Sequence, residues 1–154
     1  MAKRTFIHIK EVCPTVKRHI QIPAIIENWN LVHDFLQEVI DEMKIDRKIK
    51  SSVLLSSEEI FVNIARYAYP GSQGDVLVDI GFSPQDEIIQ VKFRDAGIPF
   101  DPTKWGVPDI HQSLEERKIG GLGIFMVRKM MDEMQYFYED GANNLLIIKK
   151  MKIV

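Results

Sequence analysis

The chain contains very little cysteine and no long apolar run. Cys13 is the single cysteine among 154 residues, so no internal disulfide can form. This fits a reducing compartment, and Cys13 is interpreted as a small apolar filler or an inert exposed thiol, because no second cysteine supports redox chemistry. The N-terminal stretch Met-Ala-Lys-Arg-Thr-Phe lacks the apolar core of a signal peptide, and no transmembrane run follows it. We therefore expect a cytoplasmic protein.

The chain also lacks a strong net charge and a clear metal-binding spacing. Its formal net charge is −2 and its pI is near 6.1, which gives no electrostatic case for binding nucleic acid or an anionic membrane. The four histidines are scattered, and none pairs with Cys13 or another histidine at a metal-binding spacing. The length of 154 residues suits one domain with one core, and we expect a single domain over residues 1–154.

Hydrophobic patterning predicts a mixture of strands and helices. Strands are predicted over residues 5–10, 76–82 and 87–94, with a terminal hairpin from 135–139 and 145–150. Helices are predicted from about residue 22 to 43, from the region 51–57 to just before Pro70, and over 124–134. Residues 14–21 are predicted to form a connection and residues 46–52 a turn. Since strands and helices do not strictly alternate, we expect an α+β two-layer sandwich, with a mixed, mostly antiparallel sheet and helices on one face.

A carboxylate and an amide lie one turn apart on the second predicted helix. Glu59 and Asn63 are four residues apart, which places them on the same helix face. Mg²⁺ takes oxygen ligands, and a carboxamide oxygen suits it beside phosphates. A carboxylate one turn away can accept a proton from water or a hydroxyl. Glu58 points about 100° away on an ideal helix, so Glu59 is the better candidate base. The alternative interpretation is an ordinary solvated helix face.

Asp95-Ala96-Gly97 follows the third predicted strand. A carboxylate at a strand end can accept a hydrogen bond from an exocyclic amine, and glycine lets the backbone turn sharply and approach a flat ring closely. The alternative is a plain Asp-Gly turn. Residues Ile98 to Pro102 continue the segment, with Phe100 interpreted as core or pocket wall.

Gly120-Gly121-Leu122-Gly123 opens the last predicted helix. Without Cβ atoms, the backbone N–H groups can face an anion, and the helix dipole at this end favours negative charge. The long stretch between Gly97 and Gly123 is typical of a lid or binding loop. It is neither a P-loop nor a dinucleotide-binding fingerprint, because no Gly-Lys-Ser/Thr is present and no glycine-rich turn follows the first predicted strand.

In their order and spacing, these three segments resemble the N, G1 and G2 boxes of the GHKL ATPase/kinase superfamily, which has the Bergerat or histidine-kinase-like ATPase fold. Within that superfamily the chain looks most like the small bacterial anti-sigma-factor serine/threonine kinases. Met-Asp-Glu-Met, near the end of the last predicted helix, is a further shared detail. The resemblance extends from about residue 5 to the C-terminus.

The resemblance implies a protein serine/threonine kinase that uses ATP and Mg²⁺. Glu59 would be the catalytic base and Asn63 the Mg²⁺ ligand. Asp95 would accept a hydrogen bond from the adenine amino group, which favours ATP over GTP. The remaining nucleotide contacts implied are Gly97, Gly120, Gly121, Leu122 and Gly123. Two further residues, Arg117 and Lys118, are open to two interpretations: contacts to the terminal phosphate, or solvated charges on the lid.

The partners are also implied by the resemblance. They are a STAS-type anti-anti-sigma protein as substrate and a sigma factor as the regulated protein, with no direct contact to nucleic acid. A homodimer through the N-terminal strand and the neighbouring helix is implied in the same way. The alternative function is a non-catalytic nucleotide-binding module that sequesters a regulatory partner protein. Glu59 argues against that alternative, because a pure binder does not need a base at this position.

Overall fold

The computed structural model describes residues 16–104 and 121–151, and the predicted strand over 5–10 lies outside them. Five strands form one sheet in the order β1-β2-β3-β5-β4, and every neighbouring pair is antiparallel. The strands are β1 (Val16–Pro23), β2 (Asp75–Ser83), β3 (Ile88–Asp95), β4 (Glu133–Glu139) and β5 (Ala142–Lys150). The helices are α1 (Trp29–Glu42), α2 (Arg47–Tyr67) and α3 (Gly121–Met130), with short 3-10 turns η1 (Ile26–Asn28) and η2 (Pro102–Lys104).

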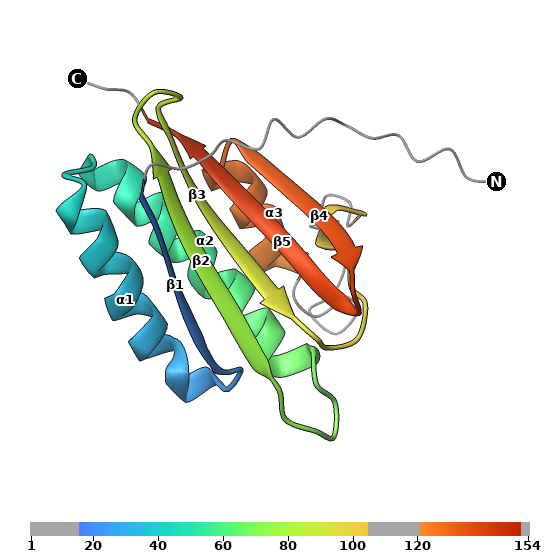
Figure 1. Ribbon diagram of the computed structural model, residues 1–154. Helices are drawn as coiled ribbons and strands as arrows, with labels where there is room; N and C mark the ends of the chain where they lie inside the picture. Colours follow the sequence, from blue (N-terminus) through green and yellow to red (C-terminus); the bar gives the residue numbers. More distant parts are fainter. Residues whose placement is uncertain (1–15, 105–120, 152–154) are drawn as a thin grey trace.

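Within the described part of the chain, α1, α2 and α3 lie on one face of the sheet (Figure 1). Helix α2 is central and packs against α1, α3 and β3. The core fills the space between the layers with side chains such as Phe61 of α2 and Phe93 of β3, both fully buried. Burying one such side chain contributes about 1.5–3 kcal/mol. The predicted α+β two-layer architecture is therefore confirmed.

The first described strand corrects the prediction for this region. Residues 14–21 were expected to form a connection, but Val16–Pro23 forms β1 and pairs with β2 along its whole length. Its charged residues are tolerated because β1 is an edge strand, and Pro23 stands at its end, where a missing N–H costs little. Arg18 is held by Glu42 of α1 at 2.7 Å.

Two helix boundaries also differ from the prediction. The first α-helix begins at Trp29 rather than near residue 22, because the chain is still in β1 at Pro23. The second begins at Arg47, within the stretch predicted to be a turn. Asp46 is its N-cap: the side chain accepts a hydrogen bond from the Lys48 N–H at 3.1 Å and so satisfies one of the free donors of the first turn.

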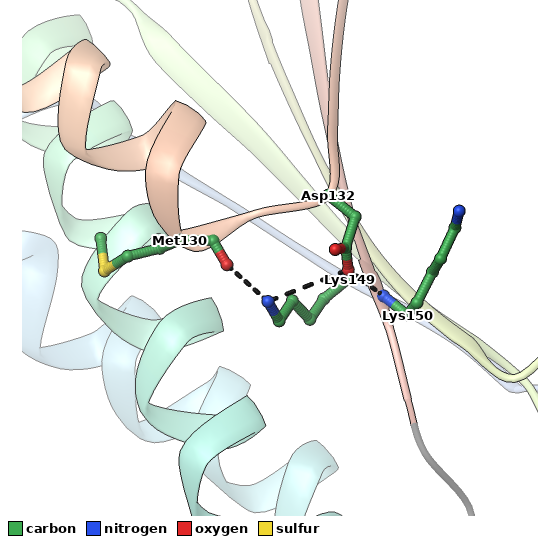
Figure 2. Close-up of polar contacts among 4 residues, drawn as sticks. All are labelled: Met130, Asp132, Lys149 and Lys150. Atoms are coloured by element: carbon green, nitrogen blue, oxygen red, sulfur yellow. Dashed lines mark hydrogen bonds and ion pairs between the residues drawn. The ribbon is translucent and has the colours of Figure 1, made fainter.

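The C-terminal end of α3 is fixed by β5. The helix was predicted over 124–134 but runs from Gly121 to Met130. Lys149 donates to the Met130 carbonyl at 2.7 Å, where a cation is favoured by the helix dipole (Figure 2). Asp132 accepts from the Lys150 N–H at 2.6 Å. Met-Asp-Glu-Met therefore forms the junction between α3 and β4 rather than the helix end.

Among residues 16–104 and 121–151, no helix is long and apolar enough to span a bilayer.

Candidate functional site

The helix-facing side of the sheet becomes polar at one end. In the register of β2, β3 and β5, Val78, Phe93 and Leu145 form one apolar row, and the next row contains Asp95 paired with Asn143. Both polar residues are only 6% exposed. A cavity of about 210 Å³ opens beside them. Its walls come from α2, the ends of β3 and β5, the segment after β3, α3 and β4: Ile60, Asn63, Ile64, Tyr67, Ala68, Asp95, Ile98, Pro99, Phe100, Pro102, Ile124, Tyr136, Asn143 and Leu145.

Asp95 is the buried carboxylate of this cavity. Its Oδ1 accepts hydrogen bonds from the Gly97 N–H and from Asn143 Nδ2, both at 3.0 Å. Burial raises the pKa of Asp95, and the hydrogen bonds from Asn143 and Gly97 partly offset that rise. Within the described residues no hydrogen bond reaches Oδ2, so one carboxylate oxygen remains available to a ligand in a largely apolar pocket.

Gly97 is required by a close approach of two backbone segments. A Cβ placed on it would lie 2.3 Å from the Ala68 carbonyl oxygen at the end of α2. At this contact the Ile98 N–H donates to the same oxygen at 2.9 Å. Tyr69 links the turn to β2: its hydroxyl donates to the Asp75 carbonyl at 2.6 Å and accepts from the Ala96 N–H at 2.9 Å. The Asp-Ala-Gly turn is therefore fixed to both α2 and β2.

Helix α2 places Asn63 and Glu59 at different parts of the site. Asn63 lines the cavity. Glu59 lies one turn nearer the N-terminus of α2 and reaches the start of α3, where a Cβ on Gly123 would be 2.2 Å from Glu59 Oε2. Asn63 thus lies at the cavity, and the Glu59 carboxylate lies at the first turn of α3. Among the described residues, no group of three or more His, Cys, Asp or Glu side chains that could hold a metal ion occurs.

The glycine-rich segment is only partly described. Gly121, Leu122 and Gly123 already belong to α3, and the Leu122 side chain is 54% exposed. Arg117, Lys118 and Gly120 lie outside the described residues. On the other side of this gap, Phe100 forms part of the cavity wall, as predicted.

Three residues of the site were missed by sequence reasoning: Asn143, Tyr136 and Tyr69. Asn143 was placed in the turn of the terminal hairpin. Strand alternation gave the missing signal, because Asn143 shares its face with Leu145 and Ile147. Tyr136 donates to Asn143 Oδ1 at 2.5 Å, and burial raises the pKa of this tyrosine, which keeps the donor proton in place. The role of Tyr69 depends on contacts that no sequence pattern indicates.

Comparisons with known proteins identify similar sequences and structures over most of the chain. The family described as the histidine kinase-like ATPase domain matches residues 22–150. A serine-protein kinase RsbW from Listeria monocytogenes is 23% identical over 129 residues, which is 80% of this chain and 81% of the relative. An RsbW from Bacillus cereus is 23% identical over 134 residues, with coverage of 84% and 82%. The crystal structure of the RsbU and RsbW domains of a Mycobacterium tuberculosis protein aligns with a TM-score of 0.64 at 18% identity, over 90% of this chain and 33% of that longer chain.

Proposed function

The chain belongs to the histidine kinase-like ATPase domain family, and from this premise we propose that it is an anti-sigma-factor-type protein serine/threonine kinase that uses Mg-ATP. The observation that carries the proposal is the buried carboxylate of Asp95, which has one free oxygen in an apolar cavity beside Asn63. The curated relatives are named serine-protein kinases, which supports the reaction class.

The cavity suits the base of a nucleotide. Its volume of about 210 Å³ is below the roughly 300–1,000 Å³ of sites that enclose a drug-sized ligand, so it suits one ring system with the remainder outside. Apolar walls from α2 and the segment after β3 would contact the flat faces of a purine. The free oxygen of Asp95 would accept from the exocyclic amine of adenine. Guanine presents a carbonyl oxygen there and would face an ionised carboxylate, so ATP is favoured over GTP.

Asn63 and Glu59 supply the chemistry next to the base pocket. Mg²⁺, when bound, would neutralise phosphate charge, and Asn63 would hold it through the carboxamide oxygen, as suits an ion that keeps waters and phosphate oxygens as its other ligands. Glu59 would accept the proton of the substrate hydroxyl as general base. The contact of its carboxylate with Gly123 would keep the base beside the first turn of α3.

The lid is proposed to surround the phosphates. The backbone N–H groups of Gly121, Leu122 and Gly123 lie in the first turn of α3, where the free donors and the dipole favour an anion. We assign Gly120 and Gly97 to the same nucleotide site. Arg117 and Lys118 are proposed as contacts to the terminal phosphate.

The protein substrate we propose is a STAS-type anti-anti-sigma protein, with a sigma factor as the regulated partner and a homodimer as the working form. The test incubates the purified chain with γ-labelled ATP, Mg²⁺ and a recombinant STAS-type protein from the same genome. Transfer of label to a serine or threonine of that protein is expected. Glu59→Gln, which keeps the shape of the side chain, should lower the transfer rate by about 10²-fold or more while ATP still binds. Full transfer in this variant would refute Glu59 as the base. Binding of ATP without any transfer by the wild type would instead indicate a nucleotide-binding module.

A further inference from the structure

Asn143 sits where the base pocket, the segment after β3 and strand β4 meet. It is 6% exposed and faces Asp95 across the β3–β5 pairing. Its Nδ2 donates to Asp95 Oδ1 at 3.0 Å and to the Ile98 carbonyl at 2.9 Å. Its Oδ1 accepts from the Phe100 N–H at 3.0 Å and from the Tyr136 hydroxyl at 2.5 Å. One side chain of β5 thus connects the end of β3, the segment that follows it and β4.

The orientation of this amide is determined by its neighbours. Two acceptors lie beside Nδ2 and two donors lie beside Oδ1, so all four hydrogen-bonding positions of the carboxamide are used. A flipped amide would bring Oδ1 against the Asp95 carboxylate and the Ile98 carbonyl, where acceptor faces acceptor, and would bring Nδ2 against the Phe100 N–H, where donor faces donor. Only one orientation is therefore stable.

The fixed Asn143 amide in turn determines which carboxylate oxygen of Asp95 is available to a ligand. Because Asn143 and the Gly97 N–H both bind Oδ1, they hold the plane of the carboxylate and reserve Oδ2 for the cavity. Without Asn143 the carboxylate would retain only the bond from Gly97 and could rotate about its Cβ–Cγ bond. Either carboxylate oxygen of Asp95 could then face the ligand, and its direction would not be fixed.

We propose that Asn143 is a positioning residue that holds Asp95 as a single, directed acceptor and thereby sets the preference of the site for a purine with an amino group rather than a carbonyl oxygen at C6. The inference rests on the proposed function, since it assigns a nucleotide base to this cavity. Asn143 acts through Asp95. It provides selectivity between purines that the shape of an apolar pocket alone cannot provide, because isosteric rings fit such walls equally well.

The test compares Asn143→Ala with Asn144→Ala. Asn144 is the next residue of β5, is 1% exposed and is also an amide, but it faces the other side of the sheet and its Nδ2 donates to the Ala142 carbonyl at 3.2 Å. It therefore controls for the loss of a buried asparagine in the same strand. The probes are ATP and inosine triphosphate, which carries a carbonyl oxygen in place of the exocyclic amine. Calorimetric titration gives Kd for each nucleotide, and circular dichroism confirms that each variant is folded.

The wild type and Asn144→Ala should prefer ATP, and Asn143→Ala should lose about tenfold or more of that preference, mainly through weaker ATP binding. If the role of Asn143 were purely structural, Asn143→Ala would weaken the binding of both nucleotides by the same factor. A folded Asn143→Ala protein with an unchanged ratio of the two Kd values would therefore overturn the inference, while the proposed function would stand. If Asn143→Ala does not fold, Asn143→Ser replaces it. Its hydroxyl can donate to Asp95 but cannot make the other three bonds, so an intermediate ratio is expected and a wild-type ratio would overturn the inference. A wild type that binds neither nucleotide would overturn both proposals.

Discussion

Replacing Gly97 by alanine is expected to separate the Asp95-Ala96-Gly97 turn from the end of α2. The added Cβ would lie 2.3 Å from the Ala68 carbonyl oxygen and 2.6 Å from the Ala68 Cβ. The first of these is backbone at the end of a packed helix, so it cannot rotate away as a flexible side chain can. The Ile98 N–H, which donates to the same oxygen at 2.9 Å, would be displaced with the turn.

The magnitude follows from two contributions. Overpacking costs about 1–3 kcal/mol, and the lost hydrogen bond costs about 0.5–1.5 kcal/mol. The free energy of unfolding should therefore fall by about 1.5–4.5 kcal/mol, which for a domain of this size lowers Tm by roughly 3–18 °C. Thermal unfolding followed by circular dichroism measures the shift. Ala68→Gly in the same background should rescue only part of it, because the carbonyl oxygen remains in place.

The control is Gly123→Ala. Its Cβ would meet Oε2 of Glu59, which is the far end of a flexible side chain and can move. Alanine also gains up to about 1 kcal/mol over glycine in a helix. This variant should keep or raise Tm, in contrast to Gly97→Ala. A Gly97→Ala protein that melts within about 1 °C of the wild type would refute the close approach at Ala68.

Further predictions concern the same site and the core. Gly123→Ala should lower phosphotransfer because it displaces the Glu59 carboxylate, and in a Glu59→Ala background the added methyl should have no further effect on the rate. Since burial raises the pKa of Asp95 above its ordinary 3.8, ATP affinity should begin to fall at a higher pH than for an exposed aspartate as the solution is acidified. Because the pKa of Asp95 is raised, its carboxyl group holds a proton more tightly in the folded state than in the unfolded state. The contribution of Asp95 to the free energy of unfolding therefore falls as pH rises from about 3.8 through the pKa of the folded state. Asp95→Asn should fold, bind ATP more weakly and lose this pH dependence in calorimetry. Phe93→Ala should lower the free energy of unfolding by about 3–5 kcal/mol in urea titration, since Phe93 is fully buried.

Local chemistry explains which elements were predictable. The β2–β3 hairpin combines alternating apolar residues with a Ser-Pro-containing turn, and both strands occur close to their predicted positions. The α+β class and the family are confirmed. In contrast, the strand over 16–23 carries three basic residues and ends at Pro23, so its local pattern resembles a connection. Its pairing with β2, more than fifty residues away, decides the outcome.

In the candidate site too, some residues could be predicted from local sequence and others depend on contacts between distant segments. Asp95 and Gly97 were predicted as site residues because Asp-Ala-Gly follows a strand and is one of three segments whose order and spacing resemble the boxes of the family. Strand alternation can place Asn143 on the same face as Leu145, but its role depends on the register between β3 and β5 and on contacts to Ile98, Phe100 and Tyr136, which the sequence does not show. The second role of Gly97, the approach to Ala68, likewise depends on where α2 ends relative to the sheet. The residues that we propose to bind the ligand could be predicted from the sequence, whereas the residues that hold them in place could not.

The most direct test of the account is calorimetric titration of the purified wild-type chain with ATP and with GTP, each with and without Mg²⁺. We predict that ATP binds, that Mg²⁺ strengthens the binding, and that GTP binds more weakly by at least about tenfold, because it presents a carbonyl oxygen to Asp95. Equal binding of the two nucleotides would contradict the role of Asp95 as the acceptor for adenine. No binding of either would contradict the proposed kinase function.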